Sequence, residues 1–404
     1  MRRIYCLIVW LCVMIASRAT AGLRLGDDVL SVHGFSELKG KRVGLITNPS
    51  GVTRDRQPVI DLLLHAPGVH LVSLFGPEHG LYGTAKAGDR VGDGSDLRTG
   101  LPVYSLYGTT RKPTPAMLKG LDALVYDVQD IGCRSYTFIS TMGLAMEACA
   151  ENGVEFVVLD RPNPLGGIRV EGPSLEPKFR SFVGEWPIPY VYGLTCGELA
   201  RMINSERWIS RQCNLTVIPM QGWGRAMTWA DTGLAWAPTS PKIQKSESAL
   251  YYAATGILGE VGGLNLGGNF KMSFQCVTAP WLDAHKSYRQ FNSYNLPGVF
   301  FEPFSINTTT YAQHGIRILF TNSLTAPLVA INFYALDAVR KMAGRNLVAE
   351  AALARHDLTM FDKINGTDRI RKALMAGESA ESIVKSWKID EDTFRALRQK
   401  YLIY

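Results

Sequence analysis

The stretch Leu71–Gly80 places an acid and an imidazole side by side at the end of an apolar run. Val69–Phe75 has a β-rich apolar pattern that ends at Gly76-Pro77, and Glu78 and His79 follow directly. Proline fixes φ and has no N–H, so a central strand does not continue through this position. A carboxylic acid and a potential base at the carboxyl end of a buried strand are well placed for acid–base chemistry.

Three other predicted strands also run into polar tetrads. These are Thr47-Asn48-Pro49-Ser50, Asp127-Val128-Gln129-Asp130 and Asp160-Arg161-Pro162-Asn163, with Arg134, Tyr136 and Thr137 close behind the second. Ligands of open parallel sheets bind at the carboxyl ends of the strands. We therefore expect the four tetrads to lie along one sheet edge and to line a shared polar cleft.

The acids of this edge point to glycoside hydrolysis. Glu78, Asp127, Asp130 and Asp160 supply the paired carboxylates that this reaction uses, one as acid and one as nucleophile or base. His79 would orient an acid or bind an anionic substituent, as would Arg134. The rival is a metal site built from Asp, Glu and His, but no tight ligand spacing supports it. The hydrolase elbow G-x-S-x-G is absent, and so is the dinucleotide fingerprint G-x-G-x-x-G after the first strand. No cofactor is therefore predicted, and no metal is predicted because the ligand spacing is missing.

Short strands alternating with helices position these residues up to about residue 220. The pattern predicts strands at Arg42–Thr47, Val69–Phe75, Pro102–Leu106, Ala123–Val128, Glu155–Leu159 and Leu215–Pro219, and helices at Gln57–His65, Pro115–Leu121, Ser140–Glu151 and Cys196–Asn204. Nearly continuous apolar strands suit a parallel sheet covered on both faces. The alternation predicts an α/β, Rossmann-like, doubly wound and mostly parallel sheet.

The alternation breaks in a segment rich in Trp, Pro, Gly and Ser at residues 223–248. We place a domain boundary near residue 245, with a catalytic domain over residues 22–245 and a smaller C-terminal α+β domain over residues 246–404 that completes the cleft. The second domain is predicted to hold a strand at His314–Phe320, helices at Ala326–Ala343, Leu347–Arg355 and Ala380–Leu402, and a polar loop at Asp362–Thr367.

Residues 1–21 have the features of a secretory signal peptide. Arg2-Arg3 precede the apolar run Ile4–Ala16, and Ala19-Thr20-Ala21 forms an A-x-A cleavage site. We expect an exported protein, periplasmic or extracellular, that starts at Gly22 and has no stable membrane span after cleavage. An uncleaved N-terminal anchor is the alternative. The net charge of +7 falls to +4 without the signal and is spread without long blocks, so nucleic acid is not an expected partner.

Five cysteines remain after the predicted cleavage, and they are widely spaced. They are Cys133, Cys149, Cys196, Cys213 and Cys276. No C-x-x-C or Cys/His ligand pattern occurs, which argues against structural zinc. An oxidising compartment would allow one or two disulfides, which the sequence does not pair.

The motifs taken together resemble the exo-β-N-acetylmuramidase family, formerly a domain of unknown function. The resemblance covers essentially the whole mature chain and rests on the segments Gly44–Gly51 (GLITNPSG), Leu74–Gly80 (LFGPEHG), Asp127–Gly132 (DVQDIG), Arg134–Thr137 (RSYT), Leu159–Gly167 (LDRPNPLGG), Ser181–Gly184 (SFVG), Gly193–Glu198 (GLTCGE) and Lys400–Tyr404 (KYLIY). It implies a Rossmann-like domain without a bound nucleotide and a smaller C-terminal domain. The implied activity is release of N-acetylmuramic acid from the non-reducing ends of peptidoglycan fragments. The family's proposed catalytic acid falls on Glu78.

Further roles in such an enzyme follow from chemistry. Asp127, Asp130 or Asp160 is a candidate partner carboxylate, and the 2-acetamido group of the substrate is the alternative nucleophile. Arg134 or Arg161 would pair with the lactyl carboxylate of muramic acid, because guanidinium suits planar bidentate contacts. The remaining candidates for substrate binding are Asn48, Gln129, Asn163, Tyr136 and Tyr192.

The chain departs from the family pattern at three places and therefore reads as a divergent member. Tyr192 stands where the family commonly has His, Lys242 replaces Asn in Ser240–Ile243, and the segment from Glu260 to Lys271 lacks the usual Arg. These changes suggest altered anchoring, with a related aminosugar or linkage as substrate. Two other functions stay open: a non-catalytic protein that binds muropeptides or glycans, and a metal-dependent hydrolase.

Overall fold

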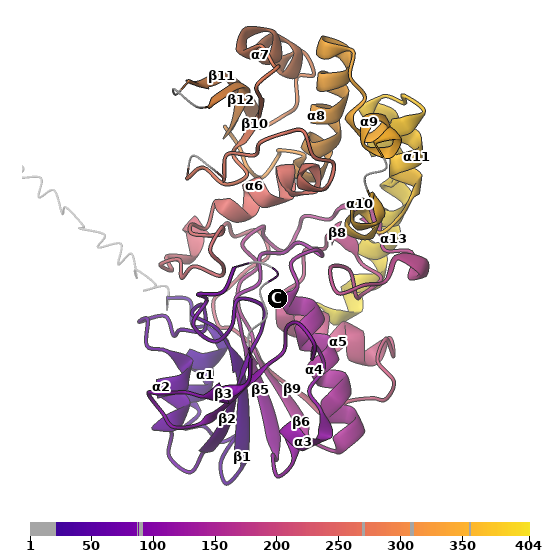
Figure 1. Cartoon of the computed structure of the whole chain (residues 1–404). Coiled ribbons are helices and arrows are strands. Elements are labelled where there is room, and N and C mark those ends of the chain that lie inside the picture. The colour runs from indigo at the N-terminus through magenta and orange to yellow at the C-terminus, as the bar shows by residue number, and fades with distance from the viewer. Residues whose placement is uncertain (1–21, 87, 89–91, 269–270, 308–310, 355–356) are drawn as a thin grey trace, which may run out of the picture.

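The computed structural model describes residues 22–86, 88, 92–268, 271–307, 311–354 and 357–404. The predicted signal peptide lies outside the described residues. A seven-stranded sheet flanked by helices forms one part of the molecule, and a smaller sheet with helices forms the other (Figure 1).

The large sheet has the strand order β3-β4-β2-β1-β5-β6-β9, parallel throughout except for the β3–β4 pair at its edge. Its strands are β1 (Arg42–Thr47), β2 (His70–Gly76), β3 (Gly94–Ser95), β4 (Pro102–Ser105), β5 (Ala123–Asp127), β6 (Glu155–Leu159) and β9 (Leu215–Ile218).

 The six parallel strands coincide with the predicted ones to within a residue or two at each end, β6 spanning Glu155–Leu159 as expected. The doubly wound α/β fold is therefore confirmed.

Helices cover both faces of this sheet. They are α1 (Gly26–Val32), α2 (Val59–Leu64), α3 (Pro115–Leu118), α4 (Phe138–Asn152) and α5 (Cys196–Ser205). Side chains of a strand alternate between the faces: Leu124 and Tyr126 of β5 join one core cluster with α4 and α5, while Val125 joins a second with α1 and α2. Gly153 ends α4 in the left-handed conformation, with φ of 69°, as the Asn-Gly pair predicted.

The second part of the chain is built on a three-stranded antiparallel sheet of order β10-β12-β11. Its elements are α6 (Ser248–Thr255), β10 (Cys276–Ala279), α7 (Ala284–Asn292), β11 (Val299–Asn307), β12 (Ala312–Phe320) and α8 (Leu328–Ala343). The helices α9 (Leu347–Leu353), α10 (Thr359–Asn365), α11 (Arg369–Met375), α12 (Ala380–Ser386) and α13 (Lys388–Arg398) follow, and run back toward the large sheet (Figure 1). A small ribbon of β7 (Glu171–Ser174) and β8 (Pro189–Val191) lies between the two parts.

Two predictions for this second part were wrong. The single helix expected over Ala380–Leu402 is divided at Trp387, whose buried ring packs 5.2 Å from that of Phe333 in α8. The polar loop expected at Asp362–Thr367 is largely helical, because Arg371 pairs with Asp362 at 2.9 Å and lets that acid be buried in α10.

The last residues of the chain return to the large sheet. The Ile403 amide donates to Glu198 of α5 at 2.9 Å, and the Tyr404 hydroxyl donates to Asp160 after β6 at 2.7 Å. The C-terminus accordingly lies near the carboxyl ends of the parallel strands (Figure 1).

The five cysteines of the described chain are all buried and free of disulfides.

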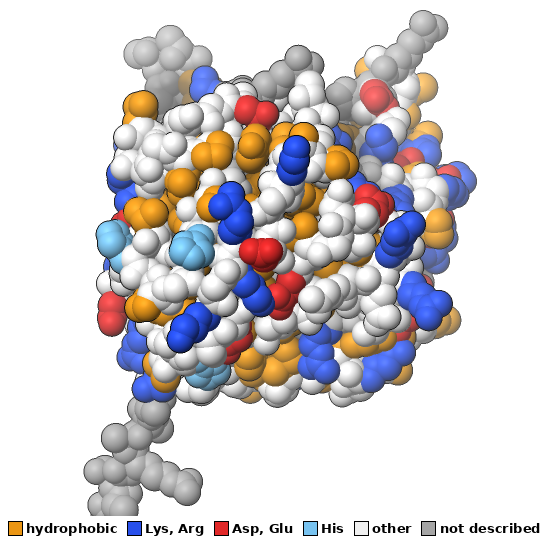
Figure 2. Space-filling model, turned by 90° about the horizontal axis from the view of Figure 1, so that it is seen from below, with side chains coloured by type: hydrophobic (Ala, Val, Ile, Leu, Met, Phe, Trp, Pro, Cys, Tyr) orange, Lys and Arg blue, Asp and Glu red, His pale blue; other side chains and the backbone are white. Residues whose placement is uncertain are grey.

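The face of the molecule seen from below in Figure 1 carries basic and acidic side chains interspersed with hydrophobic ones (Figure 2). Within the ranges that the structure describes, no helix combines the length and the apolarity needed to cross a bilayer.

Candidate active site

The four polar tetrads lie along one edge of the large sheet, because β2, β1, β5 and β6 are neighbours and run parallel. Hydrogen bonds join them laterally. Thr47 Oγ1 donates to the Asp127 carbonyl at 2.9 Å, and the Gln129 amide donates to Ser50 Oγ at 3.0 Å. The Gln129 side-chain amide reaches the carbonyl of Pro162 at 2.7 Å.

Glu78 is half-buried at this edge and is held by hydroxyl groups. Thr137, directly before α4, donates from Oγ1 to Glu78 Oε2 at 2.7 Å. Burial raises the pKa of Tyr107 to about 12, and the charge of Glu78 and a hydrogen bond to its carboxylate add to this effect. The carboxyl group is therefore oriented by two hydroxyls from different segments, an arrangement suited to an acid that transfers its proton in one direction.

The His79 ring is held by the segment that follows it. The backbone of this residue is left-handed, with φ of 71°, and its Nδ1 lies 2.9 Å from the carbonyl of Ala85. The ring lines a cavity of about 400 Å³ together with Tyr82 and Leu97. The left-handed conformation is costly for a residue other than glycine, and here it separates the directions of two consecutive side chains.

Asp127 and Arg161 form a buried ion pair. Arg161 Nε donates to one oxygen of Asp127 at 2.5 Å, and its Nη2 donates to the other at 2.8 Å and to Asp27 at 2.9 Å. All three side chains are at least 96% buried. Their charges satisfy each other inside the fold, so neither the Asp127 carboxylate nor the Arg161 guanidinium faces the edge as a free group.

Asp160 is fully buried, and both of its oxygens accept hydrogen bonds. One oxygen accepts from the Gly197 amide at 2.8 Å, and the other from the hydroxyls of Thr195 and Tyr404, each at 2.7 Å. Burial raises its pKa to about 6, while these bonds act in the opposite direction. Asp160 thus fastens the start of α5 and the C-terminus to the end of β6.

Asp130 is the predicted acid with an unsatisfied oxygen. Tyr192 and the Gly132 amide both donate to Oδ2, the amide at 2.6 Å, while the buried Oδ1 has no hydrogen-bond partner. Burial raises the pKa of Asp130 to about 6. Tyr192, which departs from the family pattern, therefore acts on this acid through its hydroxyl.

Arg134 is fully buried and donates only to backbone carbonyls. Its Nη1 binds those of Pro173 and Ile188 at 2.8 and 2.6 Å, and its Nη2 binds that of Ile364 at 2.8 Å. Burial lowers its pKa to about 10. The side chain joins the β7–β8 ribbon to α10 and is enclosed by protein.

The predicted amides and Tyr136 also have partners within the protein. Asn48 Oδ1 accepts from the Ser50 amide at 2.9 Å, and Asn163 Nδ2 donates to the Leu194 carbonyl at 2.9 Å. The Tyr136 hydroxyl lies 2.8 Å from that of Thr239. All these side chains are more than nine-tenths buried. They therefore support the segments at the strand ends from within the protein.

Tyr252, in the second part of the chain, contacts the segment that leads to Thr137. The ring of Tyr252 in α6 packs at 5.9 Å on Tyr136, and its hydroxyl lies 3.0 Å from that of Ser135. Burial raises the pKa of Tyr252, and the charges of Glu78 and Glu260 raise it further. Both carboxylates therefore lie within electrostatic reach of one phenol. Sequence reasoning assigned no role to Tyr252 or Glu260, because neither stands at the end of a predicted strand.

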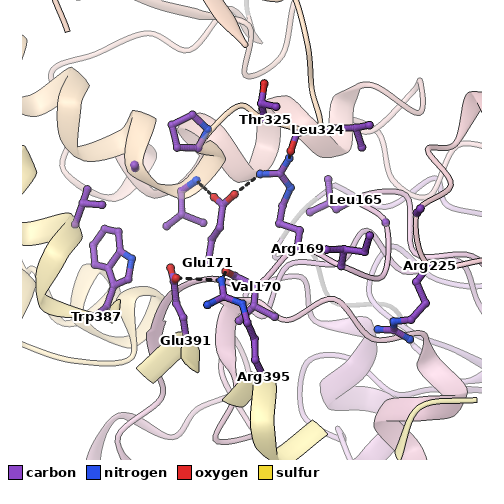
Figure 3. Close-up of a pocket in the computed structure, with 17 residues that line it drawn as sticks. Leu165, Arg169, Val170, Glu171, Arg225, Leu324, Thr325, Trp387, Glu391 and Arg395 are labelled. Carbon is purple, nitrogen blue, oxygen red and sulfur yellow. Dashed lines mark hydrogen bonds and ion pairs between the residues drawn. The ribbon is translucent and has the colours of Figure 1, made fainter. Parts of the chain in front are cut away.

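A cavity of about 490 Å³ lies elsewhere, between β7, α8, α12 and α13 (Figure 3). The guanidinium groups that line it form ion pairs with carboxylates of the protein. Arg169 pairs with Glu171, and Arg395 pairs with Glu391 at 3.1 Å. Arg225 pairs with Glu198 at 2.6 Å. The candidate active site is therefore the edge at Glu78 rather than this cavity.

No group of three His, Cys, Asp or Glu side chains gathers in a metal-binding arrangement in the described part of the chain. The site therefore consists of a half-buried, oriented carboxylic acid at the polar edge of a doubly wound sheet. This arrangement is typical of an α/β enzyme that uses general acid–base catalysis.

Comparison with known proteins identifies the family. Models of the N-terminal and C-terminal domains of exo-β-N-acetylmuramidase NamZ match residues 43–247 and 250–404. The peptidoglycan β-N-acetylmuramidase NamZ of Bacillus subtilis is 41% identical over 388 residues, which is 95% of this chain and 91% of that protein. The chain belongs to the NamZ exo-β-N-acetylmuramidase family and is a glycosidase, as the sequence motifs indicated.

Two crystal structures of DUF1343 family proteins from Bacteroides fragilis share the fold. One superposes with a TM-score of 0.88 at 45% identity, and the other with a TM-score of 0.69 at 28% identity. Each comparison covers 95% of this chain and 99% of the other. Both parts of the structure are thus common to these relatives.

Proposed function

We propose that the protein is an exported exo-β-N-acetylmuramidase that releases N-acetylmuramic acid from the non-reducing ends of peptidoglycan fragments. The observation that carries this proposal is the half-buried Glu78, oriented by Thr137 at the carboxyl edge of the sheet. Family membership and the peptidoglycan muramidase of Bacillus subtilis supply the substrate class.

In the proposed reaction Glu78 is the general acid. It donates its proton to the glycosidic oxygen as the bond to the anomeric carbon breaks, so the leaving sugar departs as an alcohol. Thr137 remains bonded to the other carboxyl oxygen and keeps the proton-bearing oxygen directed at the substrate. A water molecule then attacks the anomeric carbon, its oxygen becomes the new hydroxyl group, and the proton that it releases passes to a carboxylate and restores the acid form of Glu78 for the next turnover.

For the second catalytic carboxylate we propose Asp130 or Glu260. Asp130 keeps one buried oxygen without a hydrogen-bond partner, and the charge of Glu260, like that of Glu78, raises the pKa of Tyr252, whereas Asp127 and Asp160 are enclosed by their protein partners. Such a carboxylate would stabilise the positive charge that develops on the sugar or activate the water. If neither Asp130→Asn nor Glu260→Gln lowered turnover, the 2-acetamido group of the substrate would take this role.

The test of the activity is hydrolysis of p-nitrophenyl β-N-acetylmuraminide and of a muramic-acid disaccharide by wild type and Glu78→Gln. Loss of the general acid should lower kcat by about 10²–10⁴-fold for the disaccharide, and less for the nitrophenyl compound, whose leaving group needs little protonation. Glu378→Gln, at an exposed acid, is the control. Binding without turnover by wild type would favour the non-catalytic alternative.

Export rests on the N-terminal sequence pattern. Mass spectrometry of the protein from the periplasm or medium should give a mature chain that begins at Gly22. Recovery of the full-length chain only from the cytoplasm would contradict this part of the proposal.

A further inference from the structure

We propose that Arg111 binds the carboxylate substituent of the sugar held at Glu78, and so makes the site selective for an acidic aminosugar. This inference rests on the proposed function, because it concerns the substrate of the same site. It assigns the role to a residue in none of the polar tetrads at the strand ends.

A short row of side chains connects Arg111 to Glu78. The Arg111 guanidinium lies over the ring of Phe182, with 4.6 Å between its central carbon and the ring centroid. The Phe182 ring packs on Tyr107 with 5.9 Å between centroids, and the Tyr107 hydroxyl interacts with Glu78. The acid and the cation are therefore linked through the contacting rings of Tyr107 and Phe182.

The electrostatics agree with this placement. Burial is the main cause that raises the pKa of Tyr107, the negative charge of Glu78 adds to it, and the positive charge of Arg111 opposes it. Both charges thus act on the same phenol. An acid for the glycosidic oxygen and a cation for an anionic substituent are both available to one sugar placed against Tyr107.

The other arginines considered for this role are committed inside the protein. Arg134 is enclosed by protein and binds three backbone carbonyls, and Arg161 is neutralised by Asp127 and Asp27. Arg111 is exposed, and no carboxylate among the described residues forms a salt bridge with it. Stacking on Phe182 holds the guanidinium plane while leaving its N–H groups to a ligand, and this fork suits a carboxylate.

The ligand class that fits is a hexosamine bearing a carboxylate on an ether side chain, as in muramic acid. The matching neutral sugar is N-acetylglucosamine, which lacks that substituent. A guanidinium that contacts only this substituent discriminates between the two sugars and leaves the chemistry at the anomeric carbon to Glu78.

The decisive measurement is binding of free N-acetylmuramic acid and of its lactyl methyl ester, by calorimetry or ligand-observed NMR. In Arg111→Gln, affinity for the acid should fall about tenfold or more, while affinity for the ester stays unchanged. Arg111→Lys should recover part of the loss, because it restores the charge without the planar fork. The preference of wild type for the acid should also decline with added salt, and that of Arg111→Gln should not.

Arg180 offers a matched control nearby. It too is exposed and lies over an aromatic ring, that of Trp186 at 5.7 Å, but its charge is paired with Glu185 at 2.5 Å. Arg180→Gln should bind both sugars as wild type does.

Two outcomes overturn the inference: equal loss of both ligands in Arg111→Gln, or acid binding as tight as in wild type. Since binding is read without turnover, a protein that binds the acid through Arg111 but hydrolyses nothing would contradict the proposed function alone.

Discussion

Thr137 Oγ1 donates a hydrogen bond of 2.7 Å to Oε2 of Glu78. The donor belongs to the chain after β5 and the acceptor to the chain after β2, two strands separated in the sheet by β1. This bond holds the Glu78 carboxyl group in one direction. The hold comes from a neighbouring segment of the sheet edge and not from the strand end that carries Glu78.

Replacement of Thr137 by valine should lower kcat about 10- to 100-fold with little change in KM. The variant loses one hydrogen bond to a charged group, worth about 1.5–3 kcal/mol, and about 1.4 kcal/mol corresponds to a factor of ten in rate. Thr137→Ser should retain most of the activity. Thr141→Val is the control, since Thr141 is buried in α4, the helix that follows Thr137, and its hydroxyl has no partner. Equal losses in the two valine variants would show a packing effect only.

Replacement of Arg161 by methionine should destabilise the fold rather than weaken substrate binding. The change leaves Asp27 and Asp127 buried without their cation, and breaking such a pair costs about 3–5 kcal/mol. Urea unfolding should show the loss, while KM of the remaining folded enzyme stays near that of wild type. Arg211→Met, at an exposed position, should leave both quantities unchanged. A large rise in KM without a loss of stability would instead return Arg161 to the role of a ligand-binding residue.

The six parallel strands of the large sheet were predicted from the sequence to within a residue or two at each end. The elements of the second part of the chain were predicted less accurately. Glu155–Leu159 is buried on both faces of a parallel sheet, so its apolar run is a direct signal. Strand β11 was not predicted, because it lies at the edge of its sheet, alternates in exposure and contains Pro303. The break at Trp387 depends on packing against Phe333, which local periodicity does not contain.

The gathering of the four polar tetrads at one edge of the sheet was predictable, but the surroundings of each acid were not. Strand ends indicate which residues reach the edge. They do not reveal that Arg161 bends back onto Asp127, or that Tyr404, which is 244 residues distant in sequence, binds Asp160. Such partners come from tertiary contacts. Thr137 lies within one of the sequence motifs, but its hydrogen bond to Glu78 is a tertiary contact that the sequence alone does not indicate.

Asp130 should make stability depend on pH below neutrality. Burial raises its pKa from 3.8 to about 6, so the folded protein keeps a proton there that the unfolded chain releases. The resulting stabilisation is complete below about pH 4 and is lost as the pH rises through 6. Asp130→Asn should remove this dependence, so that its stability relative to wild type rises by roughly 2–3 kcal/mol from pH 4 to 7. Urea unfolding across this range checks it, with exposed Asp55→Asn as control; parallel curves for wild type and Asp130→Asn would contradict it.

Replacement of Tyr404 by phenylalanine should destabilise the protein, and more so at high pH. The Tyr404 hydroxyl donates to Asp160 at 2.7 Å and accepts from the Met220 amide at 2.8 Å, and leaving these buried groups without it costs about 1–3 kcal/mol. Burial raises the pKa of Asp160 to about 6, and the bond from Tyr404 opposes that rise. Its loss shifts this pKa upward, so the folded variant holds its proton to higher pH and continues to lose stability where wild type has levelled off. The deficit should therefore be larger at pH 8 than at pH 5 in thermal or urea unfolding.

Tyr401→Phe is the control, because it removes a hydrogen bond to the partly exposed Glu206. Its loss of unfolding free energy should be smaller than that of Tyr404→Phe at both pH values. An equal effect of the two variants would show that the tail is not anchored through Asp160.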